Sequence, residues 1–138
     1  MTLKVQYVPL NFVAQTWPLV EGYINDAFTK STGDDYTLDQ VRVFVSSGQW
    51  LLLIAIDEEG KIHGAATSSF INYPNDRVAF ITSIGGKLIS SQETFGQLKS
   101  ILKANGATKI QGAARESIAR LWRRFGFKER YITVETRI

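Results

Sequence analysis

The chain has 138 residues, of which 44% are hydrophobic and 21% charged, with 16 Lys and Arg against 13 Asp and Glu. These values are typical of one globular domain and exclude a disordered, collagen-like or coiled-coil chain. The sequence has no cysteine and one histidine, which excludes disulfide scaffolds, cysteine nucleophiles and multi-histidine metal sites, so we predict no metal site.

The N-terminal quarter predicts one strand and one helix. Apolar and polar side chains alternate over residues 3–8, which is typical of a half-buried strand. After Trp17, apolar residues recur at helical spacing. We expect this helix to begin near Pro18, because a first helical turn does not need the missing N–H. A polar stretch at 31–36 predicts a loop.

The next segment predicts a short helix and a hairpin. Thr37 and Gln40 have the spacing of a capping box, and Gly48 ends the apolar stripe that follows them. Residues 50–56 and 61–71 are rich in apolar side chains and flank an acidic turn, so we expect them to form two paired strands.

A fourth strand and a third helix are expected next. Residues 77–84 form the predicted strand, which runs into Gly85-Gly86. Ser90 and Glu93 then have capping-box spacing before another apolar stripe, so a helix should follow the glycine pair. Such a strand-to-helix junction suits a phosphate group, because backbone N–H groups and the positive end of the helix dipole point at it.

The C-terminal part predicts a short strand, a helix and a closing strand. Residues 109–113 form the short strand, an apolar stripe that stops at Gly126 marks the helix, and residues 127–138 form the last strand. This order predicts an α+β fold with a mixed, mostly antiparallel sheet and helices on both faces. The strands at 77–84 and 109–113 should run parallel and be joined by the third helix.

The element order and the stretch from Arg115 to Phe127 resemble the GCN5-related N-acetyltransferase (GNAT) superfamily. In that family a helix ending in an aromatic-x-x-x-Gly-Phe pattern, here Trp122 to Phe127, packs beside the pantetheine arm of acyl-coenzyme A. Over nearly its whole length the sequence is similar to the tailed-phage acetyltransferase-like variant. The motifs that carry this similarity are Tyr36-Thr37, Gly48 to Leu51, Thr67, Tyr73-Pro74, Gly85-Gly86 and Arg115.

The resemblance implies a GNAT-like (acyl-CoA N-acyltransferase) domain over residues 1–138. It implies an acetyl-CoA-dependent N-acetyltransferase that acts on a primary amine of a small molecule or protein, with acetyl-CoA as co-substrate. The residues expected to bind acetyl-CoA are Ile84, Gly85, Gly86, Lys87, Ser91, Arg115 and Trp122. No catalytic side chain is assigned, because the sequence does not show which acid and base groups lie together.

Two departures from the family pattern support a second hypothesis. The usual Gln/Arg-x-x-Gly-x-Gly/Ala pyrophosphate loop is absent between the fourth strand and the third helix. Trp122 stands where many members place a tyrosine that protonates the leaving thiolate, and an indole is no acid at neutral pH. The alternative is therefore a catalytically silent GNAT-fold phage protein that binds a host or virion protein.

Two further features have both a functional and a structural explanation. His63 could be a general base, but we favour a histidine at the end of a hairpin. Arg120, Arg123 and Arg124 could hold a coenzyme phosphate, but we favour a solvated helix face opposite the apolar stripe.

Charge and hydropathy also predict the kind of partner. From Ala107 onward the chain has 8 Lys and Arg against 3 Asp and Glu, which suits phosphate-bearing ligands. The net charge is only +3 and no recognition motif is present, so nucleic acid is a disfavoured partner. The longest apolar run, Trp50 to Ile56, is far shorter than the roughly 20 residues of a membrane helix. We expect a cytoplasmic protein, in the host cytoplasm if phage-encoded, with no membrane partner.

Overall fold

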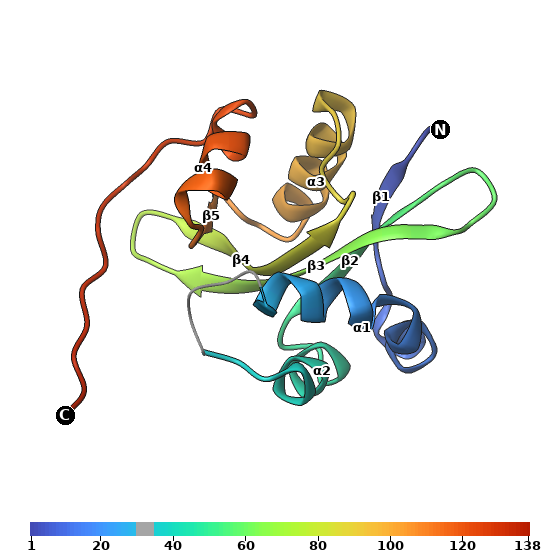
Figure 1. The fold of residues 1–138 in the computed structure, drawn as a ribbon, viewed down its shortest axis with the longest axis horizontal. Helices are drawn as coiled ribbons and strands as arrows, with labels where there is room; N and C mark the ends of the chain where they lie inside the picture. The colour runs from blue at the N-terminus through green and yellow to red at the C-terminus, as the bar shows by residue number, and fades with distance from the viewer. Residues whose placement is uncertain (30–34) are drawn as a thin grey trace.

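A five-stranded sheet forms the middle layer of the structure (Figure 1). The computed structural model describes residues 1–29 and 35–138. The strands lie in the sheet in chain order: β1 (Lys4–Tyr7), β2 (Leu51–Ile56), β3 (Ile62–Asn72), β4 (Arg77–Gly86) and β5 (Lys109–Gly112). The first four strands are antiparallel, and β5 pairs with β4 in parallel. The predicted mixed, mostly antiparallel sheet is confirmed.

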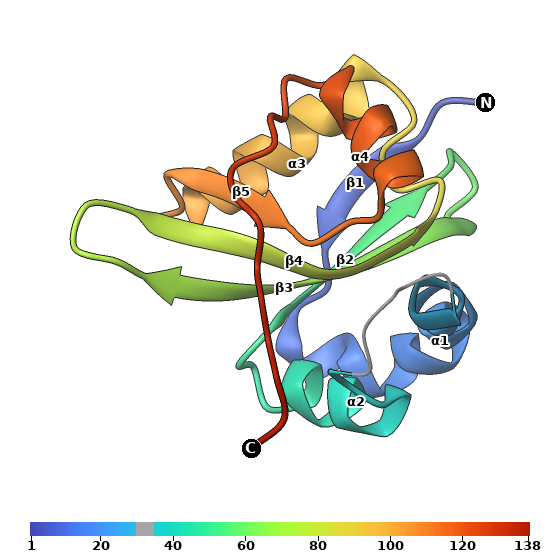
Figure 2. The ribbon, with the colours of Figure 1, turned by 60° about the vertical axis from the view of Figure 1, so that its left-hand side comes forward.

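Helices cover both faces of this sheet, with α1 and α2 on one side and α3 and α4 on the other (Figure 2). Their bounds are α1 (Val13–Thr29, preceded by a 3₁₀ turn at Leu10–Phe12), α2 (Leu38–Ser46), α3 (Gln92–Ala104) and α4 (Glu116–Arg123). Within the described residues, no helix is long and apolar enough to cross a membrane.

The continuous apolar run of β2 follows from this layering. Leu52 and Ile54 pack against α1 and α2, whereas Leu53 and Ala55 pack on the opposite side with α3 and α4. Because both faces are covered, the strand needs no polar alternation. Burying one large apolar side chain contributes about 1.5–3 kcal/mol, so the two cores position the sheet firmly.

The helix α3 connects the two parallel strands, as predicted. Its buried side is formed by Phe95, Leu98 and Leu102, which recur at helical spacing and pack on the sheet. The register joins Val78 of β4 to Lys109 of β5. A parallel pair requires such a crossover, and α3 supplies it.

Two predicted helix starts differ from the structure. α1 begins at Val13 and contains Pro18, because burial of Val13 and Trp17 offsets the roughly 3 kcal/mol that an interior proline costs. The capping box of α3 is formed by Ser91 and Thr94, one residue later than predicted. The capping box of α2 is as predicted. The predicted loop at 31–36 falls mainly on residues 30–34, outside the described part.

The predicted closing strand at 127–138 is wrong. Phe127 packs against Trp122, but residues 128–138 contain no strand and are exposed. In Figure 1 this segment leaves the body of the protein after α4 and ends away from the sheet. Alternating apolar residues form a strand only where an edge and a covered face are available, and this direction provides neither.

Removal of residues 131–138 is expected to change the free energy of unfolding by less than about 0.5 kcal/mol, as is usual for exposed positions. Urea denaturation of the full-length and shortened proteins measures this difference. A loss above about 2 kcal/mol would show that the segment pairs with a sheet after all.

Candidate functional site

The two parallel strands separate part-way along the sheet. β4 and β5 are paired from Val78 to Ile81 on one strand and from Lys109 to Gly112 on the other. β4 then continues through residues 82–86 without β5 beside it. We call this opening the fork, and its narrow end lies where Ile81 meets Gly112.

A β-bulge lies at the narrow end of the fork. Thr67 of β3 is opposite Ser83 of β4, but the next residue, Ser68, is opposite Ile81. Thr82 is therefore the extra residue of the bulge. A bulge bends its strand, which accounts for β4 turning away from β5 at this point.

The fork leaves backbone groups of β4 without a strand partner. The Lys87 N–H donates to the His63 carbonyl at 2.8 Å, and Gly64 is opposite Gly86. In an antiparallel ladder, hydrogen-bonded and non-bonded pairs alternate. The N–H and C=O groups of Ile84 and Gly86 are therefore directed away from β3, into the fork.

The glycine pair is tightly enclosed on the other side. A Cβ on Gly85 would lie 2.2 Å from the Tyr23 carbonyl oxygen of α1. A Cβ on Gly86, which has a φ of +65°, would lie 2.5 Å from the His63 carbonyl oxygen. These glycines let α1 approach β4 closely. Glycine is therefore needed here for packing, in addition to its predicted role in ligand binding.

The predicted phosphate cradle is partly occupied by the protein itself. The Lys87 N–H is already bonded to His63, while its side chain is exposed. The Ser91 hydroxyl accepts the Thr94 N–H and caps α3. The groups left for an anion are the Lys87 ammonium and the first N–H groups of α3, which have no partner within a helix.

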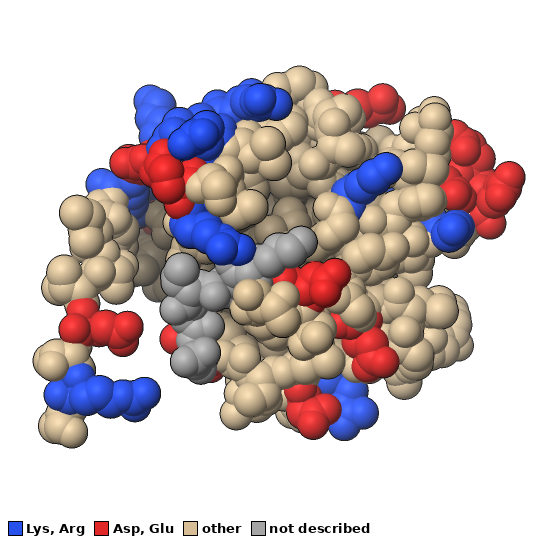
Figure 3. Space-filling model, viewed as in Figure 1, with Lys and Arg blue, Asp and Glu red and all other residues tan. Residues whose placement is uncertain are grey.

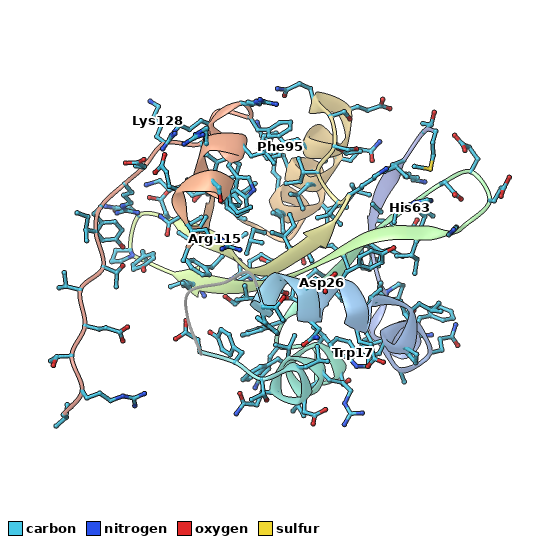
Figure 4. The ribbon with its side chains drawn as sticks, in the orientation of Figure 1. Trp17, Asp26, His63, Phe95, Arg115 and Lys128 are labelled. Atoms are coloured by element: carbon cyan, nitrogen blue, oxygen red, sulfur yellow. The ribbon has the colours of Figure 1, made fainter. Side chains whose placement is uncertain are left out.

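The helix α4 covers the β5 side of the fork. Trp122 is 9% exposed, and its ring packs so closely on Gly112 that a Cβ there would lie 2.6 Å from it. Arg115 is exposed at the N-terminal end of α4 (Figure 4). Ile84 and Gly86 thus lie on the β4 side of the fork and Trp122 on its β5 side. Arg115 follows three residues after Gly112, where β5 ends.

Three hydroxyl groups gather at the bulge, and the sequence reasoning missed two of them. Thr67 Oγ1 lies 2.7 Å from Thr82 Oγ1 and 2.5 Å from Ser83 Oγ. The signal that could have found them is the adjacent pair Thr82-Ser83, which interrupts the continuous apolar run of β4. Two neighbouring polar residues inside a buried strand indicate a bulge.

His63 lies at the hairpin between β2 and β3, as favoured, on the opposite side of the view from Arg115 (Figure 4). Its Nε2 is 2.8 Å from Asp57 Oδ2. The hydrogen bond from His63, followed by that from the Lys61 N–H, lowers the pKa of Asp57 from its ordinary value. The side-chain pair fastens the hairpin, while the His63 carbonyl accepts the Lys87 N–H beside the glycine pair.

The lowered pKa of Asp57 makes a prediction about acid stability. Its contribution is present above the unfolded pKa of about 3.9 and is lost as the pH falls through the lower folded value. We expect the wild type to lose more unfolding free energy than Asp57→Asn between about pH 5 and about pH 2. Urea denaturation at several pH values measures this, and parallel curves for the two proteins would contradict it.

Charge is divided across one face of the molecule (Figure 3). Lys and Arg gather over α4, while Asp and Glu lie over α1, α2 and the β2–β3 hairpin. On α4, Arg120 and Arg124 are exposed, and Arg123 pairs with Glu116 and Glu129. This agrees with the solvated-face hypothesis for the three arginines.

A cavity of about 520 Å³ lies at the other end of β4, beside Arg77 and Asn105. The remaining lining residues are Tyr7, Val8, Leu10, Val13, Val45, Gly48, Gln49, Trp50, Leu51, Leu52 and Phe70. None of the predicted ligand-binding residues is among them, so the fork remains the candidate site.

Solved structures with the same architecture are acetyltransferases. An aminoglycoside acetyltransferase from an uncultured soil metagenomic sample, in complex with sisomicin, matches with a TM-score of 0.70 and 12% identity over 99% of this chain and 96% of the other. A second one from such a sample matches with a TM-score of 0.69 and 20% identity over 100% and 99%. A predicted acetyltransferase from Clostridium acetobutylicum, with acetyl-CoA, matches with a TM-score of 0.66 and 14% identity over 99% and 96%.

These identities are low, so the likeness concerns the fold. No family model matches the sequence, and a search of curated proteins finds no match. The chain therefore has the α+β fold of GNAT acetyltransferase structures, as the sequence predicted.

Proposed function

We propose that the protein is an acetyl-CoA-dependent N-acetyltransferase that acts on a primary amine of a small molecule or protein. The fork is the observation that carries this proposal. The amide groups of an extended pantetheine arm can bond to the outward backbone groups of Ile84 and Gly86 in the way an added strand would. Such a ligand would lie beside residues 82–86 of β4, where β5 is missing.

The remaining predicted residues have distinct roles in the proposal. The ammonium of Lys87 and the first turn of α3, capped by Ser91, face the pyrophosphate. Arg115 is available for a coenzyme phosphate, because it is exposed beside the end of β5. Trp122 forms the apolar wall behind the arm, and Gly85 keeps α1 close to β4.

The proposed reaction needs positioning more than side-chain chemistry. The acceptor nitrogen attacks the thioester carbonyl carbon, a C–N bond forms, and the C–S bond breaks to release coenzyme A as the thiol. The proton lost by the amine passes to water and the leaving sulfur gains one. Holding the two reactants together and donating hydrogen bonds to the carbonyl oxygen can supply much of the rate enhancement.

The neighbours support an amine acceptor. They include aminoglycoside acetyltransferases and a glucosamine-6-phosphate N-acetyltransferase from Arabidopsis thaliana, which matches with a TM-score of 0.60 and 12% identity. The phage-type variant, the cytoplasmic location and a host or virion protein as a binding partner belong to the proposal and not to the fold.

The proposal is tested by release of coenzyme A thiol from acetyl-CoA in the presence of a panel of primary amines that includes sisomicin. Ile84→Pro removes the N–H that faces the fork and breaks no bond to β3, so we expect it to weaken acetyl-CoA binding at least 10-fold, or about 1.4 kcal/mol. Ile84→Val keeps the N–H and is the matched control. Equal binding by the two variants would place the coenzyme elsewhere.

The buried position of Trp122 favours the second candidate function, a catalytically silent domain that binds a host or virion protein. An indole packed on Gly112 supplies no proton to a leaving thiolate. Under this alternative the wild type shows neither thiol release nor acetyl-CoA binding. Binding of acetyl-CoA without acetyl transfer to any amine tested would indicate a domain that retains its coenzyme site but does not accept these amines.

A further inference from the structure

The hydroxyl cluster at the bulge has one proton more than its own contacts use. Thr67, Thr82 and Ser83 carry three O–H groups, while two hydrogen bonds join them. Within residues 1–29 and 35–138, no other acceptor for these hydroxyls is found. One O–H of the three is therefore left to bond outside the cluster.

Burial decides which hydroxyl carries this proton. Thr67 is 0% exposed and Ser83 is 6% exposed, whereas Thr82 is half-buried. A buried donor without an acceptor is destabilising, so the unused proton is most stable on the more exposed Thr82. In that arrangement Ser83 donates to Thr67, Thr67 donates to Thr82, and Thr82 has a free O–H.

Thr82 also occupies the narrow end of the fork. It is the first residue of β4 after the last pair with β5, and it is the bulge residue. Gly86, at the wide end near α3, is four residues away, or about 13 Å along a strand. An extended thioester that enters from the α3 end thus has its acyl group near Thr82.

We propose that the Thr82 hydroxyl donates a hydrogen bond to the acyl carbonyl oxygen of a thioester bound in the fork. This inference rests on the proposed function. When the amine attacks, the carbonyl oxygen gains negative charge, and a donor already in place stabilises it without reorganisation. Thr82 keeps its proton throughout, while Thr67 and Ser83 hold its hydroxyl in orientation.

The test compares the affinities for acetyl-CoA and for coenzyme A, which lacks the carbonyl group. Calorimetry of the full chain should show that the wild type prefers acetyl-CoA, and that Thr82→Val reduces this preference about 2- to 10-fold while leaving coenzyme A affinity unchanged. Thr82→Ser retains a hydroxyl and should restore the preference. Ser68→Ala is the control, because it also removes a hydroxyl from the region of the bulge, but Ser68 bonds to the Ser69 carbonyl and not to the cluster.

A spectroscopic signature separates a direct bond from a change in packing. The infrared carbonyl stretch of acetyl-CoA labelled with ¹³C at the carbonyl should move to lower wavenumber on binding, and less so in Thr82→Val than in Ser68→Ala. The inference would be overturned if Thr82→Val kept the wild-type preference for acetyl-CoA over coenzyme A and showed the same carbonyl shift as Ser68→Ala. The proposed function would still stand in that case. A wild type that binds neither ligand would overturn both.

Discussion

Gly85→Ala is expected to lower the free energy of unfolding by about 3 kcal/mol or more, the upper range for overpacking. The added Cβ would lie 2.2 Å from the backbone carbonyl oxygen of Tyr23. Backbone on both sides cannot yield as a flexible side chain can, so α1 must shift away from β4. Urea denaturation measures the loss, and the same shift should disturb the fork.

Gly22→Ala is the matched control for this prediction. Gly22 lies in α1, one residue from Tyr23, and a Cβ there meets nothing within 4 Å. Alanine in a helix interior is favoured over glycine by about 0.5–1 kcal/mol, so this variant should be neutral or more stable. Equal effects of the two substitutions would show that α1 does not lie this close to β4.

Trp122→Ala is expected to cost about 3–5 kcal/mol, the usual range for removing a large buried aromatic side chain. The indole is 9% exposed, and its ring centroid lies 5.1 Å from that of Phe127. The indole also covers Gly112, so Gly112→Ala should lower the free energy of unfolding of the wild type. The same substitution should lower it less in the Trp122→Ala protein, where the indole is absent.

Leu121→Ala is the control on the same helix. Leu121 is 47% exposed, so its removal should cost much less than that of its neighbour. Thermal or urea denaturation of the three variants measures the differences. An unchanged midpoint for Trp122→Ala would show that the indole is not part of the core and is free to contact a ligand.

The sequence was sufficient for the elements whose stability is local or periodic. Thr37 and Gln40 specify a helix start through their own side chains, and the stripe Phe95, Leu98, Leu102 specifies the buried side of α3. The β4–α3–β5 order then required a parallel pair. These features depend on residues close together in the chain.

Features that depend on distant partners were not predictable in the same way. Residues 127–138 are rich in aromatic and β-branched side chains, but the chain leads away from the sheet and finds no pairing edge. Pro18 is tolerated inside α1 because Val13 and Trp17 are buried against other elements. Local propensity is a weak prior when tertiary packing opposes it.

In the candidate site, too, local motifs were predictable and contacts between distant segments were not. Gly85-Gly86 was found as a motif, but its contact with Tyr23 depends on a helix more than sixty residues earlier. The fork depends on where β5 ends relative to the bulge at Thr82, which is a matter of register. Register is set by the pairing of strands and not by composition.

The central claim is that the fork binds an acyl thioester. A calorimetric titration of the unmodified protein with acetyl-CoA tests this claim most directly. We expect saturable binding of one molecule per chain and a higher melting temperature in its presence, because a ligand that binds only the folded state stabilises it. The absence of heat and of any melting shift with about millimolar acetyl-CoA, well above an ordinary cofactor affinity, would contradict the claim.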